Sequence, residues 1–174
     1  MSSQESSSVA SFGTVFADQM GMSAYKDGQW QAPTVVPTGP IPMHPAAHVL
    51  HYGSACFEGL KAYRWADGTT RMFRLDMHVK RLIQSAQKLY LPVPTTELLS
   101  GMIRDTTAAA RDVVPTRPGA LYLRPTLIGT QPNIGAAASP SDEALLFILA
   151  SPVGDYFGGD DHATRSLVAD DLMR

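Results

Sequence analysis

The chain has 174 residues, of which 44% are hydrophobic, and a formal charge of −2 from 14 Lys and Arg against 16 Asp and Glu. This length and composition are typical of a globular protein of one domain or slightly more, with enough apolar residues for a sizeable core. No basic run is longer than Lys80-Arg81, which argues against nucleic acid and against a membrane surface as partners. Charged residues make up only 17%, so we expect partners to cover part of the surface.

The cysteine count and the N-terminus bear on the compartment. Cys56 is the single cysteine, which excludes an intrachain disulfide and a thiolate metal cluster and favours a reducing environment. The sequence has no long apolar run, and its Ser-rich start lacks the basic and apolar regions of a signal peptide. We therefore expect a cytoplasmic chain without a membrane span, in which residues 1–11 form a disordered tail.

Hairpins and an extended segment are predicted in the first part of the chain. Residues 12–16 combine aromatic and β-branched residues and predict a β segment, and Asp27-Gly28 between two aromatic residues predicts a hairpin turn. Five prolines within residues 32–45 predict an extended segment that is neither a helix nor a central strand. A second hairpin is predicted over residues 59–75, with its turn at Ala66-Asp67-Gly68.

Two amphipathic helices are predicted next. Asp76 is expected to cap the first helix, whose apolar residues recur at helical spacing until Pro92 stops it. The second helix is expected to begin near Thr95 or Thr96 and to end before Pro115. Each helix has one apolar face, so we expect both to cover a sheet.

The two strongest strand patterns follow at residues 121–128 and 144–150, and the second is apolar on both faces, as in a central strand. The loop between them, residues 129–142, is long enough to be a candidate functional loop. These elements predict an α+β fold over residues 12–157, with an antiparallel-rich sheet covered by two helices. Residues 158–174 are predicted to be an interdomain linker and the start of a further domain.

Familiar catalytic motifs are weak in this sequence. His44, His48 and His51 could share a metal ion, but no Asp, Glu or Cys at a matching spacing completes the ligand set. The segment around Ser54 and Cys56 forms no G-x-S-x-G elbow, and a lone cysteine is more often a buried apolar residue than a nucleophile. The glycines after residue 128 match neither a dinucleotide-binding turn nor a P-loop.

Two arginines are candidate functional residues. Arg81 lies in the first predicted helix beside its apolar stripe, where a guanidinium would bind a fixed phosphate or carboxylate or, equally, an ion-pair partner. Arg124 lies in an apolar strand pattern, where its charge is costly unless it is paired or faces a polar cavity. The residues alone therefore favour a function for Arg124 more than for Arg81.

Several motifs, in order along the chain, resemble the branched-chain amino acid aminotransferases, which are fold-type IV enzymes that use pyridoxal phosphate. The resemblance runs from about Phe12 to Phe157 and includes His51-Tyr52-Gly53, Phe57-Glu58-Gly59-Leu60-Lys61-Ala62-Tyr63-Arg64, His78 with Arg81-Leu82, and Tyr122-Leu123-Arg124-Pro125-Thr126-Leu127-Ile128-Gly129-Thr130. It implies that the α+β domain is the small N-terminal domain of such an enzyme.

The resemblance also implies roles for particular residues. Arg81 would bind the phosphate of pyridoxal 5'-phosphate, and Arg124 would pair with the side-chain carboxylate of glutamate or 2-oxoglutarate. The pocket for the branched aliphatic side chain would be lined by Tyr52, Phe57 and Tyr122 and closed by Phe12. Tyr52 and the loop around Ile134 would reach the active site of a neighbouring subunit, which implies a homodimer.

In this family the lysine that binds the cofactor covalently lies in a second domain, so the resemblance places it beyond Arg174. The lysines of this sequence are Lys26, Lys61, Lys80 and Lys88, and none matches that position. The resemblance thus implies the N-terminal half of an aminotransferase that passes the amino group of Leu, Ile or Val to 2-oxoglutarate. The chain alone is expected to be inactive.

Two alternatives stay open at this point. D-amino acid aminotransferases and aminodeoxychorismate lyases share the fold type, although the motifs at residues 57–61 and 122–130 favour the branched-chain group. A non-catalytic small-molecule-binding or dimerisation module derived from the family would also keep these motifs without a catalytic lysine.

Overall fold

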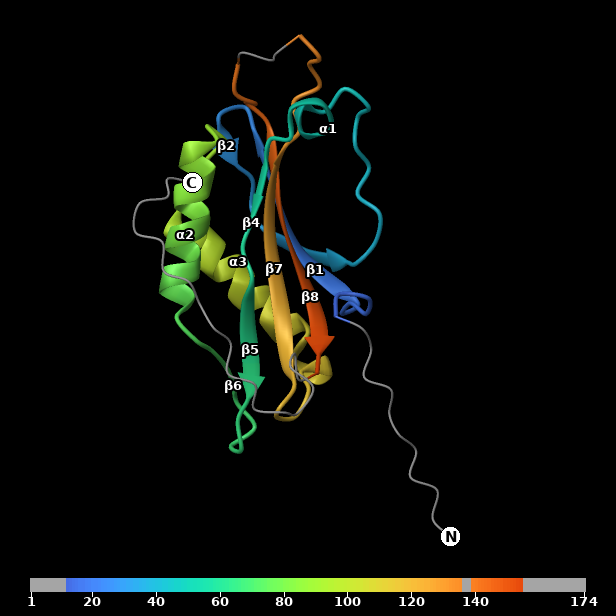
Figure 1. The fold of residues 1–174 in the computed structure, drawn as a ribbon, viewed down its shortest axis with the longest axis vertical. Coiled ribbons are helices and arrows are strands. Elements are labelled where there is room, and N and C mark those ends of the chain that lie inside the picture. The colour runs from blue at the N-terminus through green and yellow to red at the C-terminus, as the bar shows by residue number, and fades with distance from the viewer. Residues whose placement is uncertain (1–11, 136–138, 155–174) are drawn as a thin grey trace, which may run out of the picture.

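The computed structural model describes residues 12–135 and 139–154. They form an antiparallel sheet in the order β2-β1-β8-β7-β5-β6, with β3 beside β1 and β4 beside β7 (Figure 1). The strands are β1 (Gln19–Lys26), β2 (Gln29–Trp30), β3 (Thr34–Pro37), β4 (Ala55–Phe57), β5 (Leu60–Arg64), β6 (Thr70–Met72), β7 (Ala120–Gly129) and β8 (Ala144–Val153). The predicted tail at residues 1–11 and the predicted linker and domain start at residues 158–174 lie outside the described residues.

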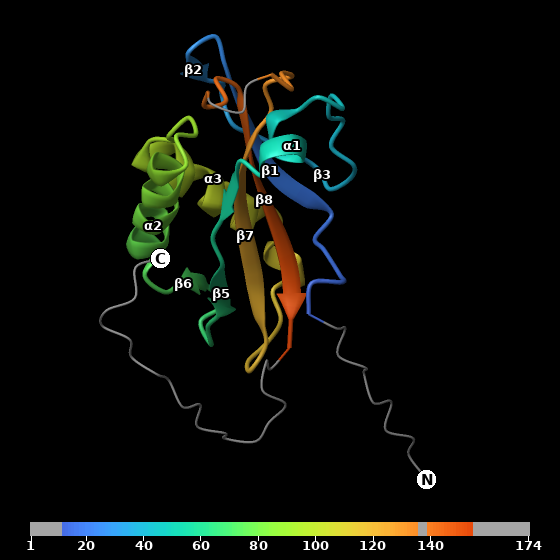
Figure 2. The same cartoon turned by 45° about the horizontal axis from the view of Figure 1, so that its top comes forward.

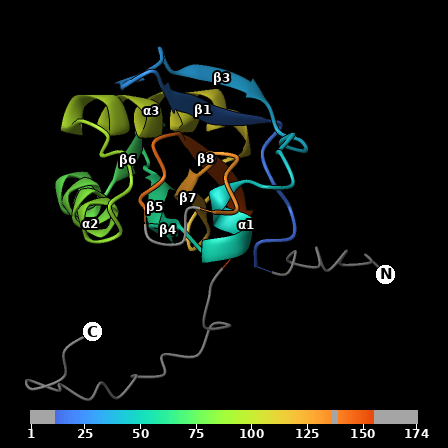
Figure 3. The same ribbon diagram turned by 90° about the horizontal axis from the view of Figure 1, so that it is seen from above.

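The helices confirm the predicted α+β class. They are α1 (His48–Tyr52), α2 (Leu75–Lys88) and α3 (Thr96–Ala109), followed by a 3₁₀ turn at Arg111–Val113. The sheet curls around α3, which contacts β1, β8 and β7, while α2 packs beside α3 and β4 (Figure 3). Within the part of the chain that the structure describes, no helix is long and apolar enough to cross a membrane.

The core lies between α3, α2 and one face of the sheet. Alternate residues of β7 and β8 belong to this core, because side chains of a strand point to opposite faces in turn. The fully buried members of the cluster include Leu82, Leu99, Met102, Ile103, Leu121, Leu123, Leu127, Leu146 and Ile148. The opposite face of β7 carries Tyr122, Arg124 and Thr126, and we call it the open face.

Most predicted strands and turns are confirmed. Asp27 and Gly28 form the turn between β1 and β2 with φ of 53° and 78°, the positive values of a type I′ turn. The proline-rich segment forms β3, which pairs with β1, and β8 lies centrally between β1 and β7. The prediction of a β segment at residues 12–16 is wrong, because β1 begins only at Gln19 and Phe12 instead packs against the ring of Tyr122.

The two predicted helices are confirmed, but one predicted cap is not. The helix α3 begins at Thr96, as predicted, and Thr95 is its N-cap, since the Thr95 side chain accepts a hydrogen bond from the Leu98 N–H at 3.1 Å. Asp76 is not the cap of α2: the N-cap is Arg74, which has φ 51° and ψ 45°. Asp76 lies in the first turn, where its negative charge interacts favourably with the positive end of the helix dipole.

Gly21 of β1 allows α3 to lie against the sheet. A Cβ at this position would be 2.3 Å from the Thr106 Oγ1 atom of α3. Thr106 is fully buried and its hydroxyl already donates to the Met102 carbonyl of the same helix, so it has no room to move away. The close approach of α3 and β1 therefore requires glycine here.

We predict that Gly21→Ala lowers the free energy of unfolding by about 1–3 kcal/mol, the usual cost of overpacking a core. Gly101→Ala is the matched control, because a Cβ at Gly101 of α3 meets no atom within 4 Å. The control should raise stability by up to about 1 kcal/mol through helix propensity. Urea unfolding of both variants is the measurement, and equal effects of the two substitutions would refute the close-contact argument.

Candidate functional site

Most of the residues predicted to bind substrate meet on the open face of the sheet. Tyr122 and Arg124 are two residues apart on β7 and so share a face. Phe57 of β4 pairs with Thr126, which puts it on the same face, and it is 60% exposed. Lys61 of β5, opposite Tyr122, lies there as well.

Arg124 is held by aromatic groups rather than by an acid in the described residues. Its Nε and Nη2 atoms donate to the Tyr122 hydroxyl at 3.0 and 2.8 Å. Its guanidinium carbon lies 4.2 Å from the centre of the Phe57 ring and 5.3 Å from the centre of the Tyr122 ring. Such contacts stabilise the cation without neutralising its charge, which suits a group that binds an anionic ligand.

A small cavity adjoins Arg124. Its volume is about 210 Å³ and its lining includes Phe12, Phe16, Tyr122, Arg124 and Leu149. Drug-sized sites hold roughly 300–1,000 Å³, so this cavity suits a group the size of an amino-acid side chain. Its walls are mostly apolar, with the cation of Arg124 at one side, a combination that fits an aliphatic chain next to a carboxylate.

The 12–16 segment covers this cavity. The Phe12 ring meets Tyr122 in an edge-to-face arrangement with centroids 5.0 Å apart. Ser151 of β8 donates its hydroxyl to the Val15 carbonyl at 2.6 Å and ties the segment to the sheet. Phe12 thus lines the cavity together with Tyr122 and Arg124.

Gly59 fixes the position of the Tyr122 ring. A Cβ on Gly59 would be 2.3 Å from the Tyr122 hydroxyl and 3.0 Å from Cζ, so the ring lies directly on the glycine backbone. Gly59 was not among the site residues predicted from the sequence. The signal was present as a glycine at the start of a strand, where a glycine often marks a close approach.

Arg81 lies on α2 in an ion pair with Glu58. Its Nε and Nη2 atoms donate to Glu58 at 2.6–2.9 Å, and the His78 Nδ1 atom is 2.6 Å from the other side of the same carboxylate. The Arg81 side chain is nevertheless 63% exposed, while that of Glu58 is 10% exposed. Sequence reasoning expected an anion beside Arg81, but it named neither Glu58 nor the bond to His78.

Tyr52 lies apart from the cavity at Arg124. Tyr52 is the last residue of α1, which lies at the end of the sheet where β7 ends and β8 begins (Figure 2). The Tyr52 hydroxyl donates to the Ile134 carbonyl. Ile134 is 66% exposed. The two features that the resemblance directs toward a neighbouring subunit are therefore joined to each other in this chain.

The catalytic lysine that the resemblance places beyond Arg174 has no counterpart among the described residues. The four lysines of the sequence all fall within the described ranges: Lys26 ends β1, Lys61 is on β5, and Lys80 and Lys88 are on α2. None of the four lines the cavity at Arg124. The position expected for the catalytic lysine, beyond Arg174, stays a prediction.

The three histidines considered as metal ligands have separate partners. His48 Nδ1 is 2.8 Å from the Ser54 hydroxyl, His51 Nε2 is 2.9 Å from the Pro45 carbonyl, and the Ala46 N–H donates to His44 at 3.0 Å. Among the described residues, no group of three His, Cys, Asp or Glu is arranged to hold a metal ion.

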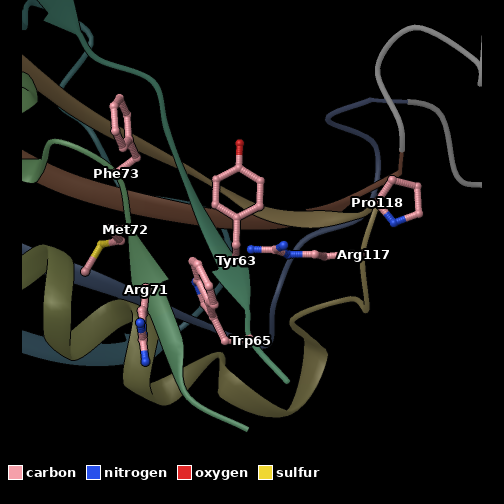
Figure 4. Close-up of a pocket in the computed structure, with 7 residues that line it drawn as sticks. All are labelled: Tyr63, Trp65, Arg71, Met72, Phe73, Arg117 and Pro118. Carbon is pink, nitrogen blue, oxygen red and sulfur yellow. The ribbon is translucent and has the colours of Figure 1, made fainter. Parts of the chain in front are cut away.

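A larger groove lies near the β5–β6 hairpin (Figure 4). Its volume is about 840 Å³, and its lining residues are Tyr63, Trp65, Arg71, Met72, Phe73, Arg117 and Pro118. The guanidinium carbons of Arg71 and Arg117 lie 4.6 and 4.5 Å from the Trp65 ring centre. Sequence reasoning missed this groove, because Arg71 and Arg117 come from distant segments.

The chain is similar in sequence to known aminotransferases. The sequence model of the family "Amino-transferase class IV" matches residues 55–172, more than half of the chain. Branched-chain-amino-acid transaminase 1 of Bacillus subtilis is 39% identical over 166 residues, which are 94% of this chain and 46% of the relative. The cytosolic branched-chain-amino-acid aminotransferase of Mus musculus is 41% identical over 160 residues, 91% of this chain and 41% of the relative.

A solved structure agrees with these relatives. The branched-chain amino acid aminotransferase of T.th. with pyridoxamine 5'-phosphate has a TM-score of 0.63 and 28% identity. The match covers 82% of this chain and 42% of that chain. The chain therefore spans less than half the length of the relatives that it matches.

Burial raises the pKa of the Cys56 thiol from 9.0 to about 11. We predict that native Cys56 reacts with iodoacetamide at pH 8 about 100-fold more slowly than the unfolded chain, because two pKa units remove that much thiolate. The raised pKa also means that folding keeps the thiol protonated: this shift does not disfavour the fold below pH 9, and it costs stability as the pH rises from 9 toward 11. Equal alkylation rates of the native and the urea-unfolded chain would contradict the prediction.

We also predict that Gly59→Ala displaces the Tyr122 hydroxyl and destabilises the chain by about 1–3 kcal/mol. In a Tyr122→Phe background the same substitution should cost less, since the atom nearest to the new Cβ is gone. Urea unfolding of the four members of this double-mutant cycle measures the difference. Strictly additive effects would show that Gly59 and Tyr122 do not restrict each other.

Proposed function

The chain belongs to the class IV aminotransferase family, and we propose that the protein containing it transfers the amino group of leucine, isoleucine or valine to 2-oxoglutarate. The observation that carries this proposal is an apolar cavity of side-chain size beside an arginine that pairs with no acid in the described residues. Both substrates of such a transfer are carboxylates, and one of them has a branched aliphatic chain. The apolar cavity can hold the branched chain, and Arg124 can pair with a carboxylate.

Arg124 is the proposed partner of the glutamate or 2-oxoglutarate side-chain carboxylate. Its Nε and Nη2 groups both donate to the Tyr122 hydroxyl, which orients the guanidinium and leaves Nη1 for the ligand. Phe12, Phe57 and Tyr122 are the proposed apolar wall for branched side chains. The wall would also exclude water and so strengthen the ionic contact at Arg124.

The fit of the family's cofactor, pyridoxal 5'-phosphate, can be tested on Arg81. Its guanidinium is exposed, and its bonds to Glu58 use Nε and Nη2, so Nη1 has donors to spare for a phosphate oxygen. The residues fit the group on this criterion. When bound, pyridoxal phosphate supplies the electron sink that amino-group transfer requires.

The amine that moves the proton is proposed to lie beyond Arg174. Lys61 is on the open face, opposite Tyr122, but it belongs to the Glu-Gly-Leu-Lys motif of the small domain. Lys80 and Lys88 lie on α2 and are exposed. A general acid–base must reach the reacting carbon, and we assign that work to the part of the family's fold that this chain does not cover.

We further propose a cytoplasmic homodimer. Cys56 is a free, buried thiol, as expected of a reducing compartment. Leu50 and Ile134 are 60% and 66% exposed and lie on α1 and on the loop joined to it through Tyr52, an apolar surface suited to a second subunit.

A transamination assay of the protein encoded by the complete reading frame that contains this chain tests the proposal. The protein should transaminate leucine, isoleucine and valine, and Arg124→Gln should raise the KM for 2-oxoglutarate about 10- to 100-fold by removing a charged hydrogen bond. The matched control is Arg104→Gln, which replaces an exposed arginine on α3 and should leave the KM for 2-oxoglutarate unchanged. Failure of the wild-type product to transaminate any branched-chain amino acid would overturn the proposed function.

A further inference from the structure

Glu58, Arg81 and His78 form a hydrogen-bonded cluster, which we call the Glu58 cluster. Glu58 lies between β4 and β5, while Arg81 and His78 are three residues apart on α2 and so share one helix face. Glu58 is only 8% exposed, yet both of its carboxylate oxygens are occupied. Oε1 accepts from Arg81 Nε and Nη2, and Oε2 accepts from Arg81 Nη2 and lies 2.6 Å from His78 Nδ1.

The carboxylate of Glu58 is fixed from its own backbone as well. The Glu58 N–H donates to the Pro125 carbonyl of β7 at 2.9 Å, which anchors the residue to the central part of the sheet. A buried carboxylate is costly unless it keeps its partners, so Glu58 holds Arg81 and His78 firmly. Arg81 would leave this pairing only at the expense of an unpaired buried charge at Glu58.

Arg81 is held by one edge and open at the other. An arginine has five N–H donors, and those of Nε and Nη2 point at Glu58. Among residues 12–135 and 139–154, no hydrogen bond donated by Nη1 is found, and the Arg81 side chain is 63% exposed. A phosphate can therefore bind at Nη1 while Glu58 keeps its own contacts.

We propose that Glu58, supported by His78, is a positioning residue that orients Arg81 for the cofactor phosphate; this rests on the proposed function, in which Arg81 binds that phosphate. A positioning role and charge alone predict opposite effects of removing Glu58 on phosphate binding. Glu58 cancels the charge of Arg81, so a purely electrostatic view makes Glu58 a competitor whose removal tightens phosphate binding. Orientation makes its removal weaken binding, because a free guanidinium loses rotamer entropy when it binds.

The sign of the effect is measured on the 174-residue chain with two probes, pyridoxamine 5'-phosphate and pyridoxamine. The Arg81 Nε–H signal in ¹H–¹⁵N spectra reports whether the phosphate binds near Arg81. The Kd for pyridoxamine divided by the Kd for pyridoxamine 5'-phosphate reports how much the phosphate contributes to binding. Glu58→Gln should reduce that ratio about ten-fold, while His78→Asn should have a smaller effect because Arg81 keeps its three hydrogen bonds to Glu58. Glu97→Gln, an exposed residue in the first turn of α3, makes the same charge change and should leave the ratio unaltered.

A second variant keeps the charge and moves the carboxylate. Glu58→Asp shortens the side chain by one methylene, so orientation predicts weaker phosphate binding and electrostatics predicts no change. This variant decides the question if Glu58→Gln does not fold, as judged from its amide spectrum. Unchanged or tighter phosphate binding in a folded Glu58 variant overturns the positioning role and leaves the proposed function intact. Equal wild-type affinity for both probes, with an unmoved Arg81 signal, overturns the assignment of Arg81 and the positioning role with it.

Discussion

The pairing of β7 with β8 constrains both the core and the candidate site. All ten residues of β7 are in register with β8, from Ala120 opposite Val153 to Gly129 opposite Ala144. A slip of one residue would turn the buried leucines of β7 to the outside, so the hydrophobic core fixes the register. The same alternation then directs Tyr122 and Arg124 to the open face. A charged group in an apolar strand thus obtains its position from the burial of its neighbours.

A proline on β7 explains the break between β4 and β5. Both strands pair with β7, β4 at residues 126–128 and β5 at residues 121–123, and Pro125 lies between these two regions. The N and C=O of one strand residue face the same neighbour, so Pro125 offers that neighbour a carbonyl but no donor. Glu58 takes the carbonyl with its N–H. The missing donor interrupts the ladder at Glu58-Gly59, while β4 and β5 keep the same register against β7 on either side, with Phe57 opposite Thr126 and Leu60 opposite Leu123.

Local signals in the sequence were sufficient for much of the fold. The Asp27-Gly28 turn, the start of α3 near Thr95 and the strand pattern of β7 depend on neighbours in the chain, and each could be predicted from residue type and spacing. Asp76 failed as a cap because the left-handed backbone of Arg74 begins the helix two residues earlier. The ion pair of Glu58 escaped prediction because its partners follow 20 and 23 residues later, and only the packing of α2 beside β4 brings them together.

The break after β4 also links the two arginines of the candidate site. Glu58 holds the guanidinium of Arg81, and the next residue, Gly59, carries the ring of Tyr122, which in turn orients Arg124. Two consecutive backbone positions therefore set the places of both cations, one on a helix and one on a strand. Because these positions are anchored to β7, the separation of the two cations is determined by the sheet and not by flexible side chains.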